Sequence, residues 1–274
     1  MCIAGAGAIK VSEAIQTVSE FSVSTGPKRA LVTGAGVRLG QAMATALGAR
    51  GWSVAVHYRH SEAGAGDTAA QIALAGGRAV TVQADLAVEE ETATLVRAAQ
   101  EALGGPLTLL VNSASTFTND SALEHGRADW DLHMEANLRA PVLLAQHFAR
   151  ALPPDLAGLI VNLIDMRVTK LNPLFFTYTL SKSALWTATR TMAQAFAPNI
   201  RVNAIGPGPT LENVHQRPGE FAAERAATLT GQGSNPEEIV RALAYLIEAE
   251  SVTGQMILSD GGQHLIWQTP DVMV

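Results

Sequence analysis

Short runs of β-branched and apolar residues alternate along the chain with longer Ala-rich stretches whose apolar positions recur at helical spacing. The runs LTLLV and GLIVNLI are apolar almost throughout, which is typical of strands that are covered on both faces. The pattern predicts strands over 29–33, 53–57, 79–83, 107–111, 158–164, 200–205 and 255–258, and helices over 39–50, 62–74, 88–103, 128–151, 176–196 and 236–249. This alternation predicts an α/β protein, with a doubly wound parallel seven-stranded sheet and helices on both faces.

No linker rich in proline, serine or charge divides the chain after residue 27, so we expect a single domain over 28–274. Residues 1–27 contain an apolar piece without a basic segment before it, which does not fit a signal peptide. We interpret them as a mobile N-terminal extension rather than a functional arm. Residues 210–234 follow Pro209 and contain several glycines, and we predict that they form a mobile flap over the substrate.

Composition and charge exclude several classes of protein. The net charge is −6 and the arginines are scattered, which argues against nucleic acid as a partner. A single cysteine, Cys2, is consistent with a reducing compartment. No apolar run is long enough to cross a membrane, so we expect a soluble, cytoplasmic protein. His133, His147, His215 and His264 have no spacing that indicates a metal site, and we expect none.

The loop after the first predicted strand reads TGAGVRLG and contains Gly34, Leu39 and Gly40. Glycines there allow a tight turn and a close approach to a pyrophosphate, and the following helix directs unpaired N–H groups at the anion. A glycine-rich turn alone is weak evidence, but its place between a strand and a helix favours a dinucleotide site.

The segment that ends the second strand contains no carboxylate before Glu62 and consists of His57, Tyr58, Arg59, His60 and Ser61. An enzyme that uses NAD usually has an acidic residue here, whereas an arginine suits the 2′-phosphate of NADP. The segment therefore favours NADPH over NADH, with an ordinary solvated loop as the alternative. Asp85 after the third strand is a candidate for the adenine amino group or for a simple turn.

Tyr178 and Lys182 lie one helical turn apart on the same face of a predicted helix. An ammonium group beside a phenol is expected to lower the pKa of the phenol towards the range of a general acid or base. This spacing is common by chance, and it gains weight only because the pair follows the fifth strand of a nucleotide-binding sheet.

From Arg29 to about His264 the chain resembles the short-chain dehydrogenase/reductase family. The resemblance rests on TGAGVRLG, the Asp85-Leu86 pair, VNSAS at 111–115, EANLRAP around Asn137, Tyr178 with Lys182, IRVNAIGPGP and SDGG. It implies a Rossmann-type fold and a homotetramer, with Asn112 bracing the central strand and Asn137 holding a water in the proton relay. It further implies cofactor contacts at Gly34, Arg38, Leu39, Gly40, Leu86, Asn112, Ala114, Ser115, Tyr178, Lys182, Pro207 and Gly208.

Three departures from the common pattern resemble the pteridine reductase and dihydromonapterin reductase branch. Asp165 stands where most members have serine, Arg38 replaces the second glycine of the first loop, and Ser115 replaces a glycine two residues before Phe117. That resemblance implies a pterin sandwiched between the nicotinamide and Phe117. It also implies proton transfer by Asp165 and Tyr178, and polar contacts from Arg38 and Ser115. Pro209 completes the expected substrate contacts.

The sequence thus predicts an NADPH-dependent reductase of a dihydropterin, namely dihydrobiopterin, dihydromonapterin or dihydrofolate. An NADPH-dependent reductase of a 3-oxoacyl thioester or small ketone is the alternative, although a carboxylate at position 165 would repel a developing alkoxide. A non-catalytic NADPH-binding protein is a third hypothesis, which the intact Tyr178 and Lys182 disfavour. Phe117 as simple packing, Asp165 as a turn residue and Arg38 as a structural cap remain alternatives to the assigned roles.

Overall fold

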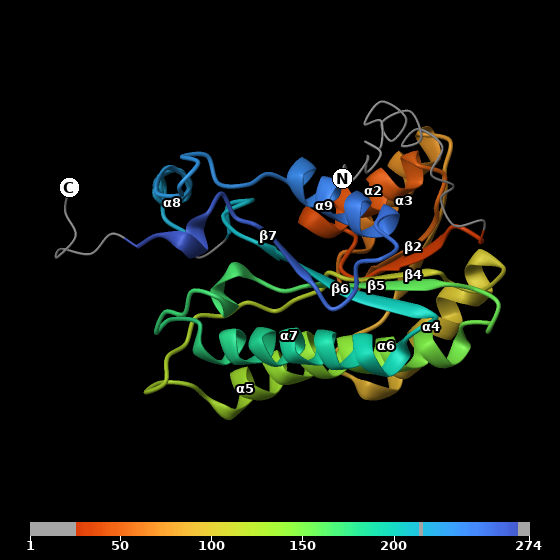
Figure 1. Ribbon diagram of the computed structural model, residues 1–274, viewed down its shortest axis with the longest axis horizontal. Helices are drawn as coiled ribbons and strands as arrows, with labels where there is room; N and C mark the ends of the chain where they lie inside the picture. The colour runs from red at the N-terminus through yellow and green to blue at the C-terminus, as the bar shows by residue number, and fades with distance from the viewer. Residues whose placement is uncertain (1–25, 214–215, 268–274) are drawn as a thin grey trace, which may run out of the picture.

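The computed structural model describes residues 26–213 and 216–267, and these residues form one parallel sheet with helices on both faces (Figure 1). The seven strands lie in the order β3-β2-β1-β4-β5-β6-β7, and every neighbouring pair is parallel. The strands are β1 (Arg29–Val32), β2 (Ser53–Tyr58), β3 (Arg78–Gln83), β4 (Leu109–Asn112), β5 (Gly158–Leu163), β6 (Ile200–Pro207) and β7 (Met256–Ser259). The predicted doubly wound sheet is confirmed.

The helices divide into two layers because each buries one apolar face against the sheet (Figure 1). One core cluster joins the sheet to α2 (Arg38–Ala49), α3 (Glu62–Leu74) and α9 (Pro236–Glu248). The opposite cluster joins it to α4 (Glu89–Leu103), α6 (Ala140–Ala151) and α7 (Phe176–Phe196). The central strands β4 and β5 are buried at every position, as their continuous apolar character predicts.

The helical region predicted over 128–151 is helical throughout, but it contains a π-helical turn that the sequence pattern did not predict. The structure has α5 (Arg127–Met134), then a π-helical turn η2 (Glu135–Arg139), then α6. The buried Asn137 lies in η2, where its side chain bonds the backbone of Thr116 instead of pointing to solvent. π-Helical turns inside helices are frequent at functional sites, and helical periodicity alone does not reveal them.

The predicted flap contains a short helix, α8 (Glu220–Ala226), and the turn after β5 forms a 3₁₀ helix, η3 (Met166–Val168). A second 3₁₀ helix, η4 (Gln263–Leu265), follows β7. The interpretations of residues 1–25, of His215 and of the tail beyond 267 lie outside the described residues.

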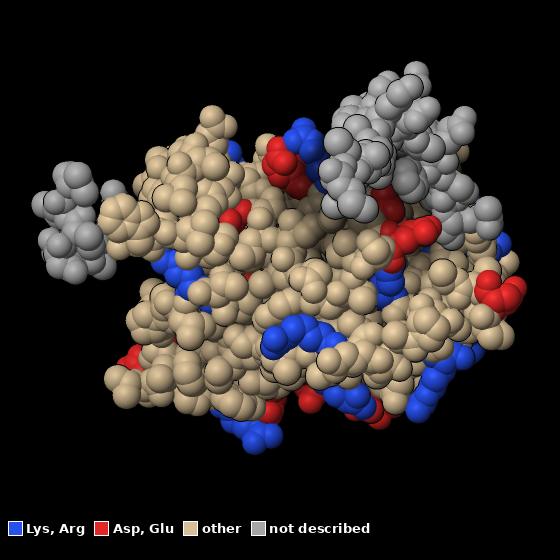
Figure 2. Space-filling model, in the orientation of Figure 1, with Lys and Arg blue, Asp and Glu red and all other residues tan. Residues whose placement is uncertain are grey.

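None of the helices in the described part of the chain is long and apolar enough to cross a membrane. On the face drawn in Figure 2, lysines and arginines are scattered among acidic and uncharged residues.

Candidate functional site

A cleft of about 1250 Å³ lies at the carboxyl ends of the strands. It spans the point where the chain order of the sheet reverses between β1 and β4, which is where open α/β sheets bind ligands. Its walls come from the glycine loop, the ends of β2 to β6, η3, the start of α7 and the flap. The segments singled out from the sequence therefore converge on one site.

The glycine loop is shaped by close backbone contacts. Gly34 has a φ of 64°, and a Cβ at Gly40 would overlap the carbonyl oxygen of Gly34. Helix α2 starts at Arg38, within this loop motif, with no side-chain cap from Val37 and no acidic residue in its first turn. Uncapped N–H groups and the positive end of the helix dipole are suited to a phosphate, so the residues present fit a dinucleotide cofactor.

Arg38 adopts a left-handed conformation, with a φ of 55°, at the position where the family has glycine. Its Nη1 donates to the carbonyl oxygen of Glu212 at 2.7 Å, and its Nη2 donates to that of Leu211 at 3.2 Å. The guanidinium thus lines the cleft while it ties the glycine loop to the flap. This tether was not foreseen from the sequence, which contains no signal for a contact 174 residues away.

The buried imidazole of His57 is hydrogen-bonded to the backbone of the glycine loop. Its Nδ1 accepts the backbone N–H of Gly34 at 3.1 Å, so the proton is on Nε2, which donates to the carbonyl oxygen of Ala84 at 3.1 Å. Burial lowers the pKa of His57 to about 4. Both ring nitrogens of His57 are engaged by the protein, although the residue lines the cleft.

The other residues at the end of β2 differ in position. Arg59 lines the cleft, and its Nη1 lies 3.8 Å from Oδ1 of Asp85. Tyr58 packs against the core, whereas His60 and Ser61 are exposed and do not line the cleft. Oδ1 of Asp85 also accepts the backbone N–H of Ala87 at 3.0 Å, as the turn interpretation predicts.

Asp165 and Tyr178 meet at the base of the cleft. The hydroxyl of Tyr178 donates to Oδ2 of Asp165 at 2.9 Å, and the other carboxylate oxygen accepts the backbone N–H of Arg167 at 2.8 Å. Asp165 caps η3 and Tyr178 lies in the first turn of α7, so two separate segments fix the pair. The Nζ of Lys182 donates to the carbonyl oxygen of Leu163 at 2.8 Å.

The predicted lowering of the Tyr178 pKa was wrong. Burial and the adjacent Asp165 carboxylate raise the pKa of Tyr178 well above its ordinary value, because a phenolate beside a carboxylate is doubly unfavourable. Burial also raises the pKa of Asp165 and lowers that of Lys182 to about 8. The arrangement keeps Tyr178 in its neutral, proton-donating form.

Two asparagines support the site from outside the cleft lining. Asn137 accepts the backbone N–H of Thr116 at 2.8 Å and the hydroxyl of Ser115 at 3.1 Å, which positions the loop after β4. Asn112 is 2% exposed and donates to Asn162 at 2.8 Å, so it braces β4 against β5. Six other expected contact residues line the cleft: Leu86, Ala114, Ser115, Pro207, Gly208 and Pro209.

An aromatic wall faces the Asp165–Tyr178 pair. The ring of Phe117 stacks on that of Phe175, with centroids 4.2 Å apart and planes inclined by 9°, and it meets Tyr178 edge-on at 4.7 Å. The guanidinium carbon of Arg167 lies 4.8 Å from the ring centroid of Phe175. Phe175 has a φ of 55°, which is strained for a bulky residue. Our sequence analysis missed Phe175 and Arg167, although both are within three residues of assigned catalytic positions.

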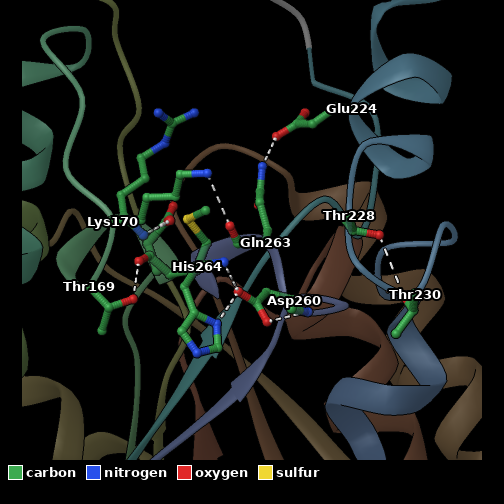
Figure 3. Close-up of polar contacts among 12 residues, drawn as sticks. Thr169, Lys170, Glu224, Thr228, Thr230, Asp260, Gln263 and His264 are labelled. Atoms are coloured by element: carbon green, nitrogen blue, oxygen red, sulfur yellow. Dashed lines mark hydrogen bonds and ion pairs between the residues drawn. The ribbon is translucent and has the colours of Figure 1, made fainter. Parts of the chain in front are cut away.

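A chain of hydrogen bonds connects the turn after Asp165 to the flap (Figure 3). Lys170 donates to the carbonyl oxygen of Gln263 at 3.2 Å, and the side chain of Gln263 donates to Glu224 of α8 at 3.0 Å. Next to it, His264 and Asp260 are paired at 2.7 Å. Figure 3 shows Gln263 between the two segments that it joins.

His133 was considered as a metal ligand because of its residue type alone. His133 is buried and bonds Thr177 and Thr118, so it has a structural place in the core. Within residues 26–213 and 216–267, no group of three or more potential ligands is arranged to hold a metal ion.

Comparison with known proteins agrees with this geometry. FolM alternative dihydrofolate reductase 1 from Brucella suis, crystallised with NADP, is 47% identical; the match covers 92% of this chain and all of that one, with a TM-score of 0.87. The landomycin C-6 ketoreductase LanV, with bound NADP and rabelomycin, is 30% identical over 87% of this chain and 97% of that one, with a TM-score of 0.79.

Among curated sequences, 3beta-hydroxysteroid dehydrogenase 1 from Eggerthella lenta is 33% identical over 87% of this chain and 94% of its own length. The family model described as enoyl-(acyl carrier protein) reductase matches residues 34–264. The chain therefore belongs to the short-chain dehydrogenase/reductase family of oxidoreductases.

Proposed function

We propose that this protein is a dihydropterin reductase, which uses NADPH to convert a dihydropterin to the tetrahydro form. The observation that carries the proposal is the 2.9 Å hydrogen bond from Tyr178 to Asp165 at the base of the cleft. A carboxyl group at this position suits protonation of a ring nitrogen, whereas it is unfavourable beside a developing alkoxide. The 47% identity to the FolM enzyme of Brucella suis supports the same substrate class.

The cofactor is NADP(H), as in the solved relatives. The N–H groups at the start of α2 would hold its pyrophosphate, and Arg59 would bind the 2′-phosphate. In that position Arg59 exchanges its 3.8 Å contact with Asp85 for a phosphate that carries more charge. When bound, the cofactor supplies the hydride that adds to the carbon of a C=N bond.

The residues of this chain supply the matching proton. Tyr178 is held neutral by burial and by Asp165, so its hydroxyl proton is available to the substrate nitrogen. The raised pKa of Asp165 keeps part of that carboxyl protonated at higher pH than an ordinary carboxyl, so it can return a proton to Tyr178. Lys182 links the end of β5 to α7 by its hydrogen bond to Leu163. It also places a positive charge near Asp165.

The aromatic wall provides the matching shape. A flat heteroaromatic ring is bound well by the face of a phenyl ring, and Phe117 lies beside Tyr178 in the cleft. Ser115 and Arg38 line the same cleft and offer donors to polar atoms of a pterin or to cofactor phosphate. Phe117 already stacks on Phe175, so the substrate ring would lie on the opposite face of Phe117 or displace Phe175.

A carbonyl reductase is the second candidate, because the ketoreductase LanV shares the fold at 30% identity. The two functions make opposite predictions for Asp165→Ser. A dihydropterin reductase loses about 100-fold or more in kcat when its acid is removed. A carbonyl reductase keeps or gains rate, because the hydroxyl can donate to the carbonyl oxygen without repelling negative charge.

Steady-state oxidation of NADPH tests the proposal. Dihydrofolate, dihydrobiopterin and dihydromonapterin are assayed beside a panel of ketones and a 3-oxoacyl thioester, with wild type, Asp165→Ser and Asp165→Asn. We expect wild type to turn over at least one dihydropterin. Its rate should fall as the pH rises through the pKa of Asp165, and Asp165→Asn should lose that pH dependence. Turnover of ketones alone, maintained in Asp165→Ser, would contradict the proposal. NADPH binding without any turnover would support a non-catalytic protein.

A further inference from the structure

We infer that Arg167 is a specificity-determining residue, which binds a carboxylate on the side chain of the substrate. The inference rests on the proposed function and deepens it. It predicts that the protein prefers a dihydropterin with an acidic side chain, such as dihydrofolate, over one with a neutral hydroxylated side chain, such as dihydrobiopterin.

The position of Arg167 is fixed by the catalytic carboxylate. Its backbone N–H donates to Oδ1 of Asp165 at 2.8 Å, while the other oxygen of Asp165 accepts from Tyr178. The side chain of Arg167 lines the same cleft. A substrate that reaches Tyr178 therefore lies close to this guanidinium.

The aromatic wall holds the guanidinium in one place. Its carbon atom lies 4.8 Å from the ring centroid of Phe175 and 6.0 Å from that of Phe117. A guanidinium at these distances is attracted by the aromatic rings, which confines it to this side of the cleft. The edge of a planar guanidinium matches the two oxygens of a carboxylate, which gives a bidentate hydrogen bond.

Other basic side chains of the cleft are engaged by the protein itself. Arg217 is paired with Glu220 at 2.6 Å, and Lys170 donates to the carbonyl oxygen of Gln263. In the part of the chain that the structure describes, no hydrogen bond or carboxylate within ion-pair distance engages the side-chain nitrogens of Arg167. Its contacts with the rings of Phe175 and Phe117 do not use its hydrogen-bonding capacity.

Arg167 also acts on the acid pair through space, because its charge lowers the pKa values of Asp165 and Tyr178 against the larger effect of burial. Removal of the charge therefore changes proton transfer for every substrate alike. The ratio of kcat/KM for dihydrofolate to kcat/KM for dihydrobiopterin isolates the contribution of Arg167 to substrate selectivity, because an effect that both substrates share cancels in this ratio.

The experiment compares full-length wild type with Arg167→Met, Arg167→Lys and the control Lys170→Met, which removes a positive charge from the same turn. We expect the ratio to fall about ten- to hundred-fold in Arg167→Met, mainly through KM for dihydrofolate. Arg167→Lys should recover part of it, and Lys170→Met should stay within about twofold of wild type. An unchanged ratio in Arg167→Met, or an equal fall in Lys170→Met, would overturn the inference.

A binding measurement separates this inference from the proposed function. Calorimetric titration of the NADP⁺-loaded protein with folate and with biopterin needs no turnover. We expect Arg167→Met to weaken folate binding about tenfold or more and to leave biopterin binding nearly unchanged. If Arg167→Met instead weakens the binding of NADP⁺, the guanidinium binds cofactor phosphate and the inference is wrong. Failure of wild type to reduce any dihydropterin, with this folate selectivity intact, would overturn the proposed function alone.

Discussion

The two ends of the cleft are built in different ways. The cofactor end is built mainly of backbone, namely glycines that allow close approach and the uncapped start of α2, with the side chains of Arg38 and Arg59 at its edge. The substrate end consists of side chains on short segments: Asp165 on η3, and Phe175 and Tyr178 at the start of α7. A backbone site tolerates little change, whereas a side-chain site can change by single substitutions. One fold can therefore carry different substrate sites beside the same cofactor site.

Strained backbone conformations occur at both ends of the cleft. Among the residues that the structure describes, the two non-glycine residues with positive φ are Arg38 at the cofactor end and Phe175 at the substrate end. Both line the cleft, and such conformations persist where the surrounding structure compensates for their cost. At both positions a large side chain of the cleft lining therefore stands on a strained backbone.

The largest expected effect concerns the substrate end. Tyr178→Phe removes the hydroxyl that bonds Asp165, and we expect kcat to fall by about 10²- to 10⁴-fold while NADPH affinity changes little. Single-turnover kinetics and NADPH fluorescence titration measure the two quantities. Tyr245→Phe, at an exposed position on α9, is the matched control and should keep full activity. A Tyr178→Phe variant with more than about a tenth of the wild-type kcat would show that another group donates the proton.

The second prediction tests whether the cofactor end depends on a neutral His57. The pKa of His57 is about 4 in the folded protein and 6.5 in an unfolded chain, so below pH 6.5 the unfolded state binds the proton first. The stability that depends on neutral His57 is therefore complete above pH 6.5 and is lost as pH falls towards 4. The shift corresponds to about 3 kcal/mol.

Urea unfolding at pH 7 and pH 5 measures this dependence. We expect His57→Gln to be less stable than wild type at pH 7 but to lose less stability on acidification. His60→Gln, at an exposed neighbouring position, should follow the wild-type pH dependence. Equal acid sensitivity of wild type and His57→Gln would assign the effect to other groups.

The third prediction tests the tolerance of the glycine loop. A Cβ at Gly40 meets the backbone of Gly34, so Gly40→Ala should cost about 1–3 kcal/mol of stability and weaken NADPH binding. Gly66→Ala on α3 is the control, because a Cβ there meets nothing within 4 Å; it should be neutral or stabilising by about 0.5–1 kcal/mol. Thermal unfolding and NADPH titration of both variants decide the point. Normal NADPH affinity in Gly40→Ala would mean that the loop adapts more easily than its contacts indicate.

The smallest expected effect separates backbone strain from side-chain function at Arg38. Arg38→Ala and Arg38→Gly both lose the bonds to the flap, but only glycine relieves the left-handed conformation. We expect the two variants to share a raised KM for NADPH. Arg38→Gly should be more stable than Arg38→Ala by roughly 0.5–1 kcal/mol in urea unfolding. Equal stability would indicate that the loop relaxes once the guanidinium is removed.

The fold was predictable because parallel strands and their covering helices leave a strong periodic signal, as in the fully buried β5. Asp165, Tyr178 and Phe117 were identifiable from motif positions, and the structure brings them together. The direction of the Tyr178 pKa shift was not predictable, because it depends on the burial of the hydroxyl and on its contact with the Asp165 carboxylate. The π-helical turn at Asn137 and the tether from Arg38 to Glu212 depend on tertiary contacts that no local pattern encodes.

Gln263 links two segments of the cleft wall by hydrogen bonds. Its carbonyl oxygen accepts from Lys170 on the turn that carries the acid, and its amide donates to Glu224 on α8. One residue thus positions the helix of the flap relative to the turn that follows Asp165, so a substitution of Gln263 would reach two walls of the cleft at once.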